Sequence, residues 1–494
     1  MRMQHEAERT YEIPARFHLP DLAEVPGVAA VDKPVERRLS ATYYDTPQLR
    51  LASHRVTLRR RTGGADAGWR VKRDASETRL PLGRKEDAVP AELLDAVRAL
   101  SRGDALRPVA RVRTRRVEHP LRGRDGRIVA LIAEDEMISE AVGDKAILQR
   151  WRELEVELVD GRSGLLDRIE HALRGAGATR SGRRSKLVHA LAERLPAAPL
   201  PTGARGRAER ALAGYVEAQR DALIANDPGV RNGDPDAVHD MRVAVRRLRS
   251  TLRTFRPALD AARTEPLRAE LAWLGRLLGA VRDADVLAGK LHDAVEAEPP
   301  ELIVGPVAER IEEYLAARTV PARAELIEAL NGRRYTALLD DLDAVVATPV
   351  RLTGSRLRRL VRRAVRRADT RLAAADRPKP TTPPGVDLLH DARKSCKQAR
   401  YAVEVLQPTD GRQAVRLADR LGRLQDVLGA HHDATVLAAL LREVGAQAQL
   451  DGESAFTYGV LHARLQQDDQ RAMSADLPGA RRRATTRKVR RVLS

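Results

Sequence analysis

The sequence predicts an α+β multidomain protein, in which an N-terminal antiparallel β-barrel with flanking helices precedes an all-α, duplicated C-terminal region. Two observations carry this prediction. Up to about residue 195 the chain has short alternating runs and turn signals, such as VTLRRRTGG and WRELEVELVDG, which are typical of antiparallel strands. From about residue 206 onward apolar residues recur at helical spacing, and one basic pattern occurs twice.

The order of the elements gives the expected domain boundaries. Helices are predicted at residues 90–100 and 163–174, within the strand-rich part. The stretch PAAPLPTGARG after Leu195 reads as a linker, so we expect one domain at 1–195, a linker at 196–206 and a helical domain at 207–494. Breaks are expected at 226–236 and 376–386, and the second separates repeat halves of about 207–375 and 387–480. The final RRRATTRKVRRV reads as a loose basic tail.

The composition indicates a globular chain with a polyanionic partner. Hydrophobic residues make up 43% of the 494, enough for real cores. The 88 Lys and Arg exceed the 69 Asp and Glu and give a net charge of +19. Aromatic residues are only 3%, so stacking platforms for unpaired bases are scarce and no specific nucleic-acid partner is expected.

Several classes of protein are disfavoured by what the sequence contains. Cys396 is the single cysteine, which excludes an intramolecular disulfide framework and fits a reducing compartment. MRMQHEAERTYEI has no apolar signal-peptide core, and no stretch approaches 18 uncharged apolar residues. We therefore expect a cytoplasmic protein without a membrane partner.

A basic face repeats in the helical part. In AVHDMRVAVRRLRSTLRTF, residues 237–255, one histidine and three arginines at offsets of 0, 3, 7 and 10 fall within about 80° on a helix. The same offsets recur 151 residues later with lysine at the third position. A single charge run is usually a solvated face, but the repetition favours a binding face. These positions are His239, Arg242, Arg246, Arg249 and His390, Arg393, Lys397, Arg400.

Two further stretches accompany this face. LGAVRDADVL follows the first copy and LGAHHDATVL the second, and we expect Arg282, Asp283 and Asp285 to order a groove wall through ion pairs. A metal site at His431 and His432 is disfavoured, because adjacent helical residues point about 100° apart. The histidines at 239 and 390 also allow a capping or inter-helix hydrogen-bond role. The run at 351–371 combines an apolar stripe with arginines on its flanks, of which Arg359 and Arg363 join the candidate set.

The paired H-x-x-R-x-x-x-[RK]-x-x-R faces resemble the CHAD family, the conserved histidine α-helical domain, over roughly residues 206–494. This resemblance implies two four-helix halves that face each other across a basic groove for inorganic polyphosphate, without a required cofactor. The residues alone indicate the same ligand class, because arginine forks suit phosphate oxygens. The candidate polyphosphate-binding residues are His239, Arg242, Arg246, Arg249, His390, Arg393, Lys397, Arg400, Arg359 and Arg363.

The strand-rich part places acids and cations at alternating positions. Glu6 and Glu8 share one strand face, and ELEVEL puts Glu153, Glu155 and Glu157 on another. Facing acids in a small barrel suggest a site for Mg²⁺ or Mn²⁺. Alternating cations lie between them, namely Arg59 with Arg61, Arg70 with Lys72, and Arg111 with Arg113 and Arg115. Such a pocket suits a metal-bound triphosphate; an alternating surface of salt bridges is the other interpretation.

The motifs E-x-E, YYDTP, TLRRR, AEDEM, ELEVEL and SKL resemble the CYTH family of triphosphate tunnel metalloenzymes over roughly residues 1–195. The resemblance implies an eight-stranded tunnel in which acids hold metal and basic residues hold a triphosphate, which some members hydrolyse. The implied metal ligands are Glu6, Glu8, Asp135, Glu155 and Glu157, and the implied triphosphate ligands are Arg59, Arg61, Lys72, Arg113, Arg115 and Lys186. Thr10 stands where the family motif E-x-E-x-K has its lysine.

The expected function is therefore polyphosphate binding by the helical domain, on cytosolic polyphosphate granules, with a tunnel that engages a polyphosphate end, a triphosphate or a nucleoside triphosphate. The alternative is a metal-dependent triphosphatase or polyphosphatase that acts in the tunnel. Thr10 predicts weak or absent activity, because a cation that would neutralise developing phosphate charge is missing.

Overall fold

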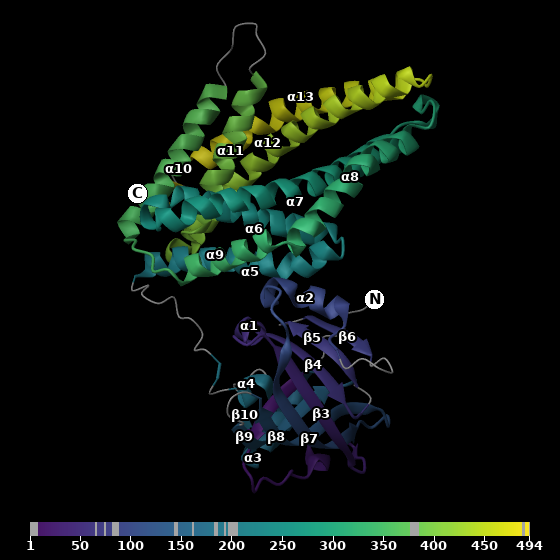
Figure 1. The fold of residues 1–494 in the computed structure, drawn as a ribbon, viewed down its shortest axis with the longest axis vertical. Helices are drawn as coiled ribbons and strands as arrows, with labels where there is room; N and C mark the ends of the chain where they lie inside the picture. Colours follow the sequence, from purple (N-terminus) through teal and green to yellow (C-terminus); the bar gives the residue numbers. More distant parts are fainter. Residues whose placement is uncertain are drawn as a thin grey trace. The chain divides into compact units, whose positions relative to one another are not determined.

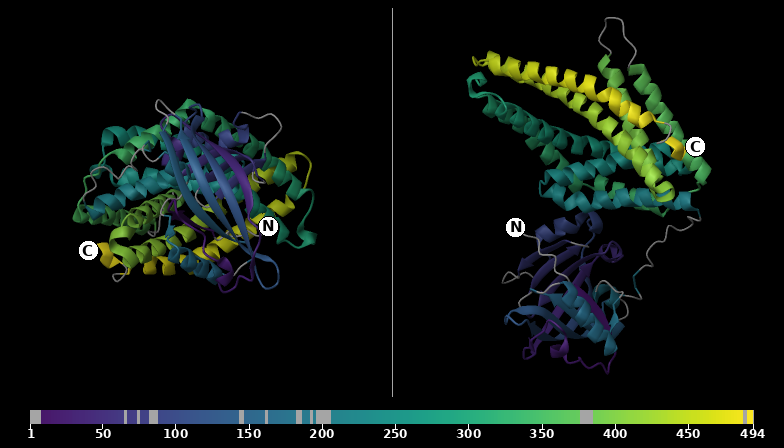
Figure 2. Two further views of the ribbon diagram at one scale, coloured as in Figure 1. Left: turned by 90° about the horizontal axis from the view of Figure 1, so that it is seen from below. Right: turned by 180° about the vertical axis from the view of Figure 1, so that it is seen from behind.

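The computed structural model describes residues 8–64, 67–73, 76–81, 88–142, 147–160, 163–181, 186–191, 194–195, 206–375, 385–486 and 490–493. Contacts divide the chain into Met1–Ala198 and Pro199–Ser494, here called the N-terminal unit and the helical unit (Figures 1 and 2). The division falls inside the predicted linker, of which residues 196–205 lie outside the described residues.

The N-terminal unit is built on one antiparallel sheet. Its strands are β1 (Glu8–Ile13), β2 (Ala30–Val31), β3 (Val35–Asp45), β4 (Val56–Thr62), β5 (Gly68–Arg73), β6 (Ser76–Pro81), β7 (Arg107–Arg122), β8 (Ile128–Ala141), β9 (Ile147–Leu158) and β10 (Thr179–Arg180). The strand order is β10-β1-β9-β8-β7-β3-β4-β5-β6, and β2 pairs with β7. Within the described segments no ladder joins β6 to β10, so the sheet is not closed there. The sheet is nevertheless curved. Lys72 on β5 lowers the pKa of Glu8 on β1, so these two strands approach each other although they are far apart in the strand order.

Helices pack on both faces of this sheet, with α3 on the outer face and α4 against the inner face. They are α1 (Arg50–Ser53), α2 (Ala91–Ser101), α3 (Ser163–Gly175) and the short α4 (Lys186–Ala190), with a 3₁₀ turn at Leu22–Glu24. The helices predicted at 90–100 and 163–174 are confirmed by α2 and α3. Leu154 and Val156 of β9 pack with Ile169 of α3 in one core. Since strand residues alternate, the acids of ELEVEL face the opposite, inner side of the sheet.

The helical unit repeats one plan of four consecutive helices. The first set is α5 (Arg207–Arg231), α6 (Pro235–Thr254), α7 (Ala261–Glu296) and α8 (Val307–Asn331); the second is α10 (Gly354–Ala375), α11 (Gly385–Glu404), α12 (Gln407–Leu450) and α13 (Phe456–Thr485). Consecutive helices pack together within each set, and α9 (Arg333–Ala347) lies between the sets in sequence (Figure 1). The predicted duplicated helical architecture is confirmed, but α10, which the predicted halves of 207–375 and 387–480 placed in the first repeat, begins the second one.

The helices α6 and α11 form because each has one continuous apolar stripe. Asp234 caps α6 by accepting from the Asp236 amide at 2.9 Å, and Pro235 begins the helix. Val238, Met241 and Val245 of α6 are buried, as are Ala392, Cys396 and Ala399 of α11. Burial of these stripes leaves the basic residues of both helices on the neighbouring face.

Two expectations about chain breaks need correction. Helix α5 continues through Asn226 and Pro228 to Arg231, so the expected break at 226–236 shrinks to residues 232–234. The reason is Asp227, whose buried carboxylate accepts from Arg231 at 2.7 Å and from Tyr335 Oη at 3.0 Å. Of the second expected break, residues 376–384 lie outside the described segments.

The C-terminal end is not a loose tail in its described part. Helix α13 extends to Thr485, and a 3₁₀ turn at Arg491–Leu493 buries Val492 and Leu493. Arg490 forms an ion pair with Asp369 of α10. Buried apolar residues and a paired arginine therefore hold the basic end against the bundle.

Candidate functional site

The register of the sheet places most of the predicted acids on one face. Glu8 and Thr10 of β1 pair with Glu157 and Glu155 of β9. On the other edge of β9, Glu153 pairs with Asp135 of β8, and Asp135 pairs in turn with Arg116 of β7. Glu8, Asp135, Glu155 and Glu157 therefore share the inner face. The fifth predicted metal ligand, Glu6, lies outside the described residues.

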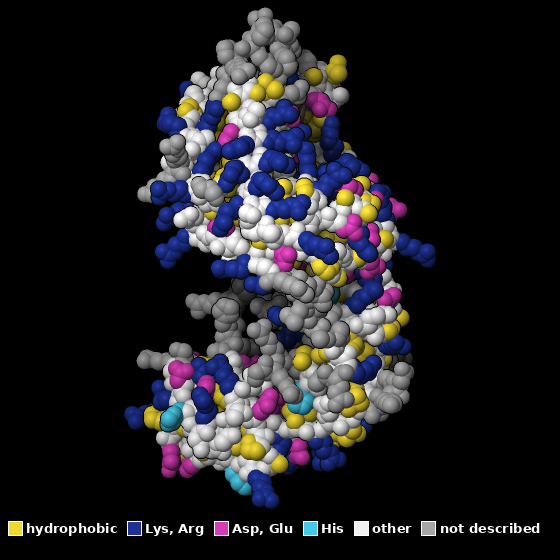
Figure 3. Space-filling model, turned by 90° about the vertical axis from the view of Figure 1, so that its left-hand side faces the viewer, with side chains coloured by type: hydrophobic (Ala, Val, Ile, Leu, Met, Phe, Trp, Pro, Cys, Tyr) yellow, Lys and Arg dark blue, Asp and Glu magenta, His cyan; other side chains and the backbone are white. Residues whose placement is uncertain are grey.

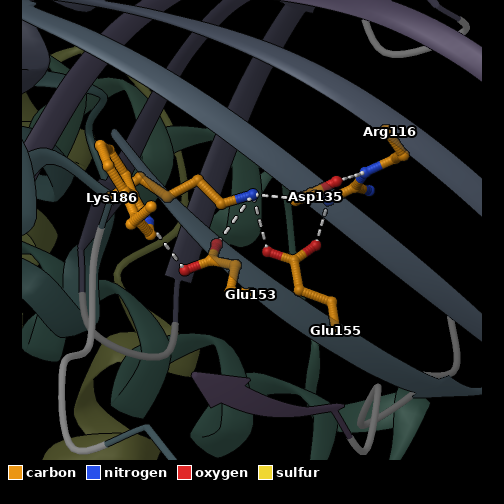
Figure 4. A network of polar contacts seen from close by, with 6 residues as sticks. Arg116, Asp135, Glu153, Glu155 and Lys186 are labelled. Atoms are coloured by element: carbon orange, nitrogen blue, oxygen red, sulfur yellow. Dashed lines mark hydrogen bonds and ion pairs between the residues drawn. The ribbon is translucent and has the colours of Figure 1, made fainter. Parts of the chain in front are cut away.

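Three of these carboxylates form a compact cluster with two cations, and the name acidic cluster is used for Asp135, Glu153 and Glu155. Their oxygens lie within 4.8 Å of one another. Lys186 Nζ lies 2.6 Å from Asp135 Oδ2, 2.9 Å from Glu155 Oε1 and 3.2 Å from Glu153 Oε1 (Figure 4). Arg116 donates two 2.7 Å hydrogen bonds to Asp135 and also contacts Glu155.

The electrostatics of the acidic cluster follow from this pairing. Burial opposes charge on Glu155, but Lys186 and Arg116 outweigh burial and hold the pKa of that carboxyl well below its usual range. Burial likewise disfavours charge on Lys186, yet the three carboxylates raise its pKa. Three carboxylates are a donor set that Mg²⁺ or Mn²⁺ accepts. In this arrangement the lysine ammonium holds the position between them.

Cations line β4 and β5 on the same inner face. Arg59 pairs in register with Tyr43 on one side and Arg70 on the other, and Arg61 pairs with Ala41. Burial lowers the pKa of Arg61, and Arg59, Arg116 and Arg70 lower it further, so these guanidinium groups lie near one another. Arg70 is buried. It belongs with the predicted Arg59, Arg61 and Lys72, although the resemblance did not include it.

Glu8 connects the acids with these cations. It keeps solvent access at the start of β1, yet burial of its carboxyl raises its pKa and Glu155 raises it further, whereas Lys72 and Lys186 lower it. Acids and cations from β1, β4, β5, β8 and β9 therefore share the inner face of the sheet.

Arg113 and Arg115 do not belong to this inner face, which corrects the predicted triphosphate ligands. Both are exposed, and Arg115 pairs with Glu36 at 2.8 Å on the outer side of the sheet. Strand alternation puts Arg116 inward instead, opposite Asp135. Sequence reasoning missed Arg116 because RVRTRRV has arginines that point to both faces of the strand. Only the pairing with Asp135 shows that Arg116 is on the inner face.

The basic faces of α6 and α11 meet in the helical unit. The two helices are in contact, and Arg246 Nε donates to Tyr401 Oη at 2.7 Å. Burial lowers the pKa of Lys397 to about 7, and Arg246, Arg393 and Arg242 lower it further. Burial also lowers the pKa of Arg393. Asp433 raises this pKa, whereas Arg246 and Arg242 lower it further. Arg242, Arg246, Arg393 and Lys397 therefore converge, and we call them the basic cluster.

Few acids balance the basic cluster. Asp283 of α7 accepts from Arg242 at 2.8 Å, and Asp433 of α12 pairs with Lys290 at 2.7 Å. Arg393 Nε is buried without a hydrogen-bond partner. Among the described residues, Lys397 Nζ has no carboxylate within ion-pair distance. The cluster has a surplus of positive charge, which an anion would relieve.

The histidines lie at the edge of the basic cluster. The ring centroids of His390 and His432 are 5.1 Å apart. Burial lowers the pKa values of both, with neighbouring cations adding to the effect, and for His239 burial is reinforced by Arg282. His431 Nδ1 pairs with Asp469 at 2.7 Å rather than with His432.

The remaining predicted residues lie farther from the cluster. Arg249 approaches Gly275 of α7 and Arg400 approaches Gly422 of α12, so the two repeats make equivalent contacts. Burial lowers the pKa of Arg249, and Arg268 lowers it further. Arg400, by contrast, forms an ion pair with Glu404 at 3.1 Å.

Arg359 and Arg363 occupy the exposed side of α10. Within the described residues no hydrogen bond or ion pair links them to the basic cluster. Lys and Arg side chains gather on that side of the helical unit (Figure 3). The structure thus places these two arginines on an outer basic surface.

Comparison with known proteins identifies both units. Residues 4–182 match the CYTH domain model and residues 214–442 match the CHAD domain model. An uncharacterised protein of Mycobacterium tuberculosis is 34% identical over 488 residues, which covers 92% of each chain. In the described residues, no helix is both long and apolar enough to cross a membrane.

Two solved structures resemble part of this chain. PptA from Streptomyces chartreusis is 24% identical and has a TM-score of 0.45, with 56% of this chain and 99% of PptA covered. The CHAD domain from the plant Ricinus communis is 25% identical, also with a TM-score of 0.45, and the match covers 58% of this chain and 94% of that domain.

Proposed function

Because the chain belongs to the proteins in which a CYTH domain is followed by a CHAD domain, we propose that its helical unit binds inorganic polyphosphate across α6 and α11. The observation that carries the proposal is the unbalanced basic cluster. Lys397 lies in the combined field of Arg246, Arg393 and Arg242, and that field lowers its pKa to about 7 together with burial. The negative charges of a bound polyanion would attract these cations and offset their mutual repulsion.

Polyphosphate suits this cluster better than nucleic acid does. It carries about one negative charge per phosphate and has no bases, so it needs many charge-assisted donors and no aromatic platform. Tyr401 is the aromatic residue beside the cluster, and its hydroxyl already accepts from Arg246. The Tyr401 ring is itself buried, so a base could not stack on it.

Each predicted residue has a defined part in the proposal. Arg242, Arg246, Arg393 and Lys397 would contact the chain directly, and His239 and His390 would add donors that phosphate favours in their protonated form. Arg249 and Arg400 extend the path along the equivalent ends of α6 and α11, and Arg359 and Arg363 supply an outer surface. Such a protein would bind polyphosphate granules in the cytosol.

The inner side of the N-terminal sheet supports a second function, binding and slow hydrolysis of a triphosphate. Acids and cations share its face, and Glu8 lies near both Glu155 and Lys72. Asp135, Glu153 and Glu155 would hold Mg²⁺ or Mn²⁺ only in place of the Lys186 ammonium, and a metal bound there would neutralise phosphate charge. Arg59, Arg61, Arg70 and Lys72 would bind the phosphate oxygens. Thr10, opposite Glu155, contributes no cation, and we expect low activity for that reason.

One experiment separates the two functions. The pure protein is incubated with tripolyphosphate, ATP or long polyphosphate, with and without Mg²⁺ or Mn²⁺, and both retained ligand and released phosphate are measured. Retention of long polyphosphate without metal and with little phosphate release supports the binding function. Rapid metal-dependent release from tripolyphosphate supports the enzyme, and failure to retain polyphosphate contradicts the main proposal.

A further inference from the structure

The position of Lys186 relative to the acidic cluster has a consequence for metal binding. Its Nζ lies 2.6, 2.9 and 3.2 Å from oxygens of Asp135, Glu155 and Glu153. A divalent cation bound by the same three carboxylates would need that central place, because Mg²⁺ requires oxygens at about 2.0–2.1 Å. An ammonium group and a metal ion cannot both occupy it. We propose that Lys186 is the resident cation of the acidic cluster and competes directly with divalent metal for it.

Lys186 is held in position by the packing of α4. It is the first residue of α4, whose Leu187 and Ala190 are buried against the inner face of the sheet. His189 of α4 stacks on Trp151 of β9 with centroids 4.0 Å apart. Trp151 Nε1 also donates to Glu153 Oε2 at 3.4 Å. The helix and the cluster therefore hold each other in place.

The charge balance also explains why a cation from α4 is needed. Asp135 is fully buried, and its carboxylate forms ion pairs with both Arg116 and Lys186. Thr10, opposite Glu155 on β1, brings no charge from that side. Arg116 supplies one positive charge, and Lys186 supplies a second against three carboxylates. Removal of Lys186 leaves a buried surplus of two negative charges, which is the environment that recruits a divalent ion.

The proposal goes beyond polyphosphate binding and does not depend on the helical unit. It predicts that the full-length protein without any phosphate compound has no tight Mn²⁺ site in the acidic cluster. Lys186→Gln should create one, so that Mn²⁺ affinity rises at least about tenfold. Lys186→Arg keeps a positive charge and should not raise it.

The test is titration of each metal-free variant with Mn²⁺, followed by the loss of the electron paramagnetic resonance signal of the free ion. The double variant Glu155→Gln with Lys186→Gln should lose the gained site, which assigns that site to the cluster. Equal Mn²⁺ affinity in the unmodified protein and in Lys186→Gln would overturn the proposal. So would a reduction in the affinity of the unmodified protein by Glu155→Gln alone.

The folding of Lys186→Gln provides an independent readout. If that variant folds, Mn²⁺ should raise its melting temperature by several degrees more than it raises that of the unmodified protein. If it does not fold alone, refolding with Mn²⁺ should recover the folded chain. A lack of any recovery with Mn²⁺ contradicts the proposal, because a competing metal should replace the lost ammonium.

Discussion

The acidic cluster of the N-terminal unit and the basic cluster of the helical unit contain the same kinds of side chain but balance their charges differently. Asp135, Glu153 and Glu155 are each within ion-pair distance of Lys186. Lys397 and Arg393 are surrounded mainly by other cations, which lower their pKa values in addition to burial. In the acidic cluster the ion pairs stabilise the fold. In the basic cluster the repulsion between cations favours binding of an anionic ligand. The predictions below test that difference.

Charge reversal in the basic cluster should have the largest effect. Arg242→Glu with Arg393→Glu should weaken polyphosphate binding at least about 100-fold, because each charged contact contributes about 1.5–3 kcal/mol. Arg482→Glu with Arg483→Glu changes the net charge equally on exposed residues of α13 and should cost only a few-fold. Titration of both double variants measures this, with circular dichroism as a folding control. Equal losses would indicate that bulk charge alone drives binding.

Loss of a paired cation in the N-terminal unit should instead affect stability. Arg116→Gln removes two hydrogen bonds from the fully buried Asp135 and should lower the free energy of unfolding by about 3–5 kcal/mol. Arg115→Gln on the same strand breaks an exposed ion pair with Glu36, and its effect on the free energy of unfolding should be far smaller. Denaturant unfolding of both variants provides the comparison. A similar small cost for both would mean that the acidic cluster is not held by its cations.

The affinity for polyphosphate should fall as the pH rises above about 7. Lys397 is half neutral near that pH in the free protein, and a bound polyanion would raise its pKa, so binding takes up a proton. Affinity should decrease about tenfold between pH 7 and pH 9. Lys397→Arg stays charged and should remove most of the dependence. Calorimetry in buffers of different ionisation enthalpy measures the proton directly, and zero uptake at pH 8 would show that Lys397 does not sense the ligand.

Addition of a cation to the paired region should have the smallest effect. Thr10→Lys places an ammonium on the inner face opposite Glu155, and it should raise metal-dependent release of phosphate from tripolyphosphate several-fold. Thr10→Gln is the uncharged control of similar length. An unchanged rate in both variants, or fast hydrolysis by the unmodified protein, would contradict the view that the missing lysine limits the chemistry.

The same comparison shows what the sequence could predict. The faces of α6 and α11 depend only on local helical periodicity, so offsets within one helix identified His239, Arg242, Arg246 and their repeats. The inner face of the sheet depends on register between strands far apart in sequence. Parity within β7 could not distinguish Arg113 from Arg116 until Asp135 of β8 was placed opposite.

Long-range packing was likewise beyond local patterns. Lys186 reaches Asp135, 51 residues earlier, only because α4 folds back onto the inner face. The resemblance identified Lys186 as a candidate through the SKL motif. Its place among the three carboxylates could be seen only in the tertiary structure. The folded C-terminal end is similar, since no periodicity near Arg490 indicates its pairing with Asp369 of α10.

The most direct test of the central claim is the accessibility of Lys397 with and without polyphosphate. Its pKa of about 7 makes the amine reactive near pH 8, where an ordinary lysine is almost entirely protonated. The protein is treated with a limiting amine-reactive label, and mass spectrometry compares Lys397 with the exposed Lys33 of the N-terminal unit. Saturating polyphosphate should suppress labelling of Lys397 at least about tenfold while Lys33 changes little. Equal suppression at both lysines, or none at Lys397, would contradict a polyphosphate site between α6 and α11.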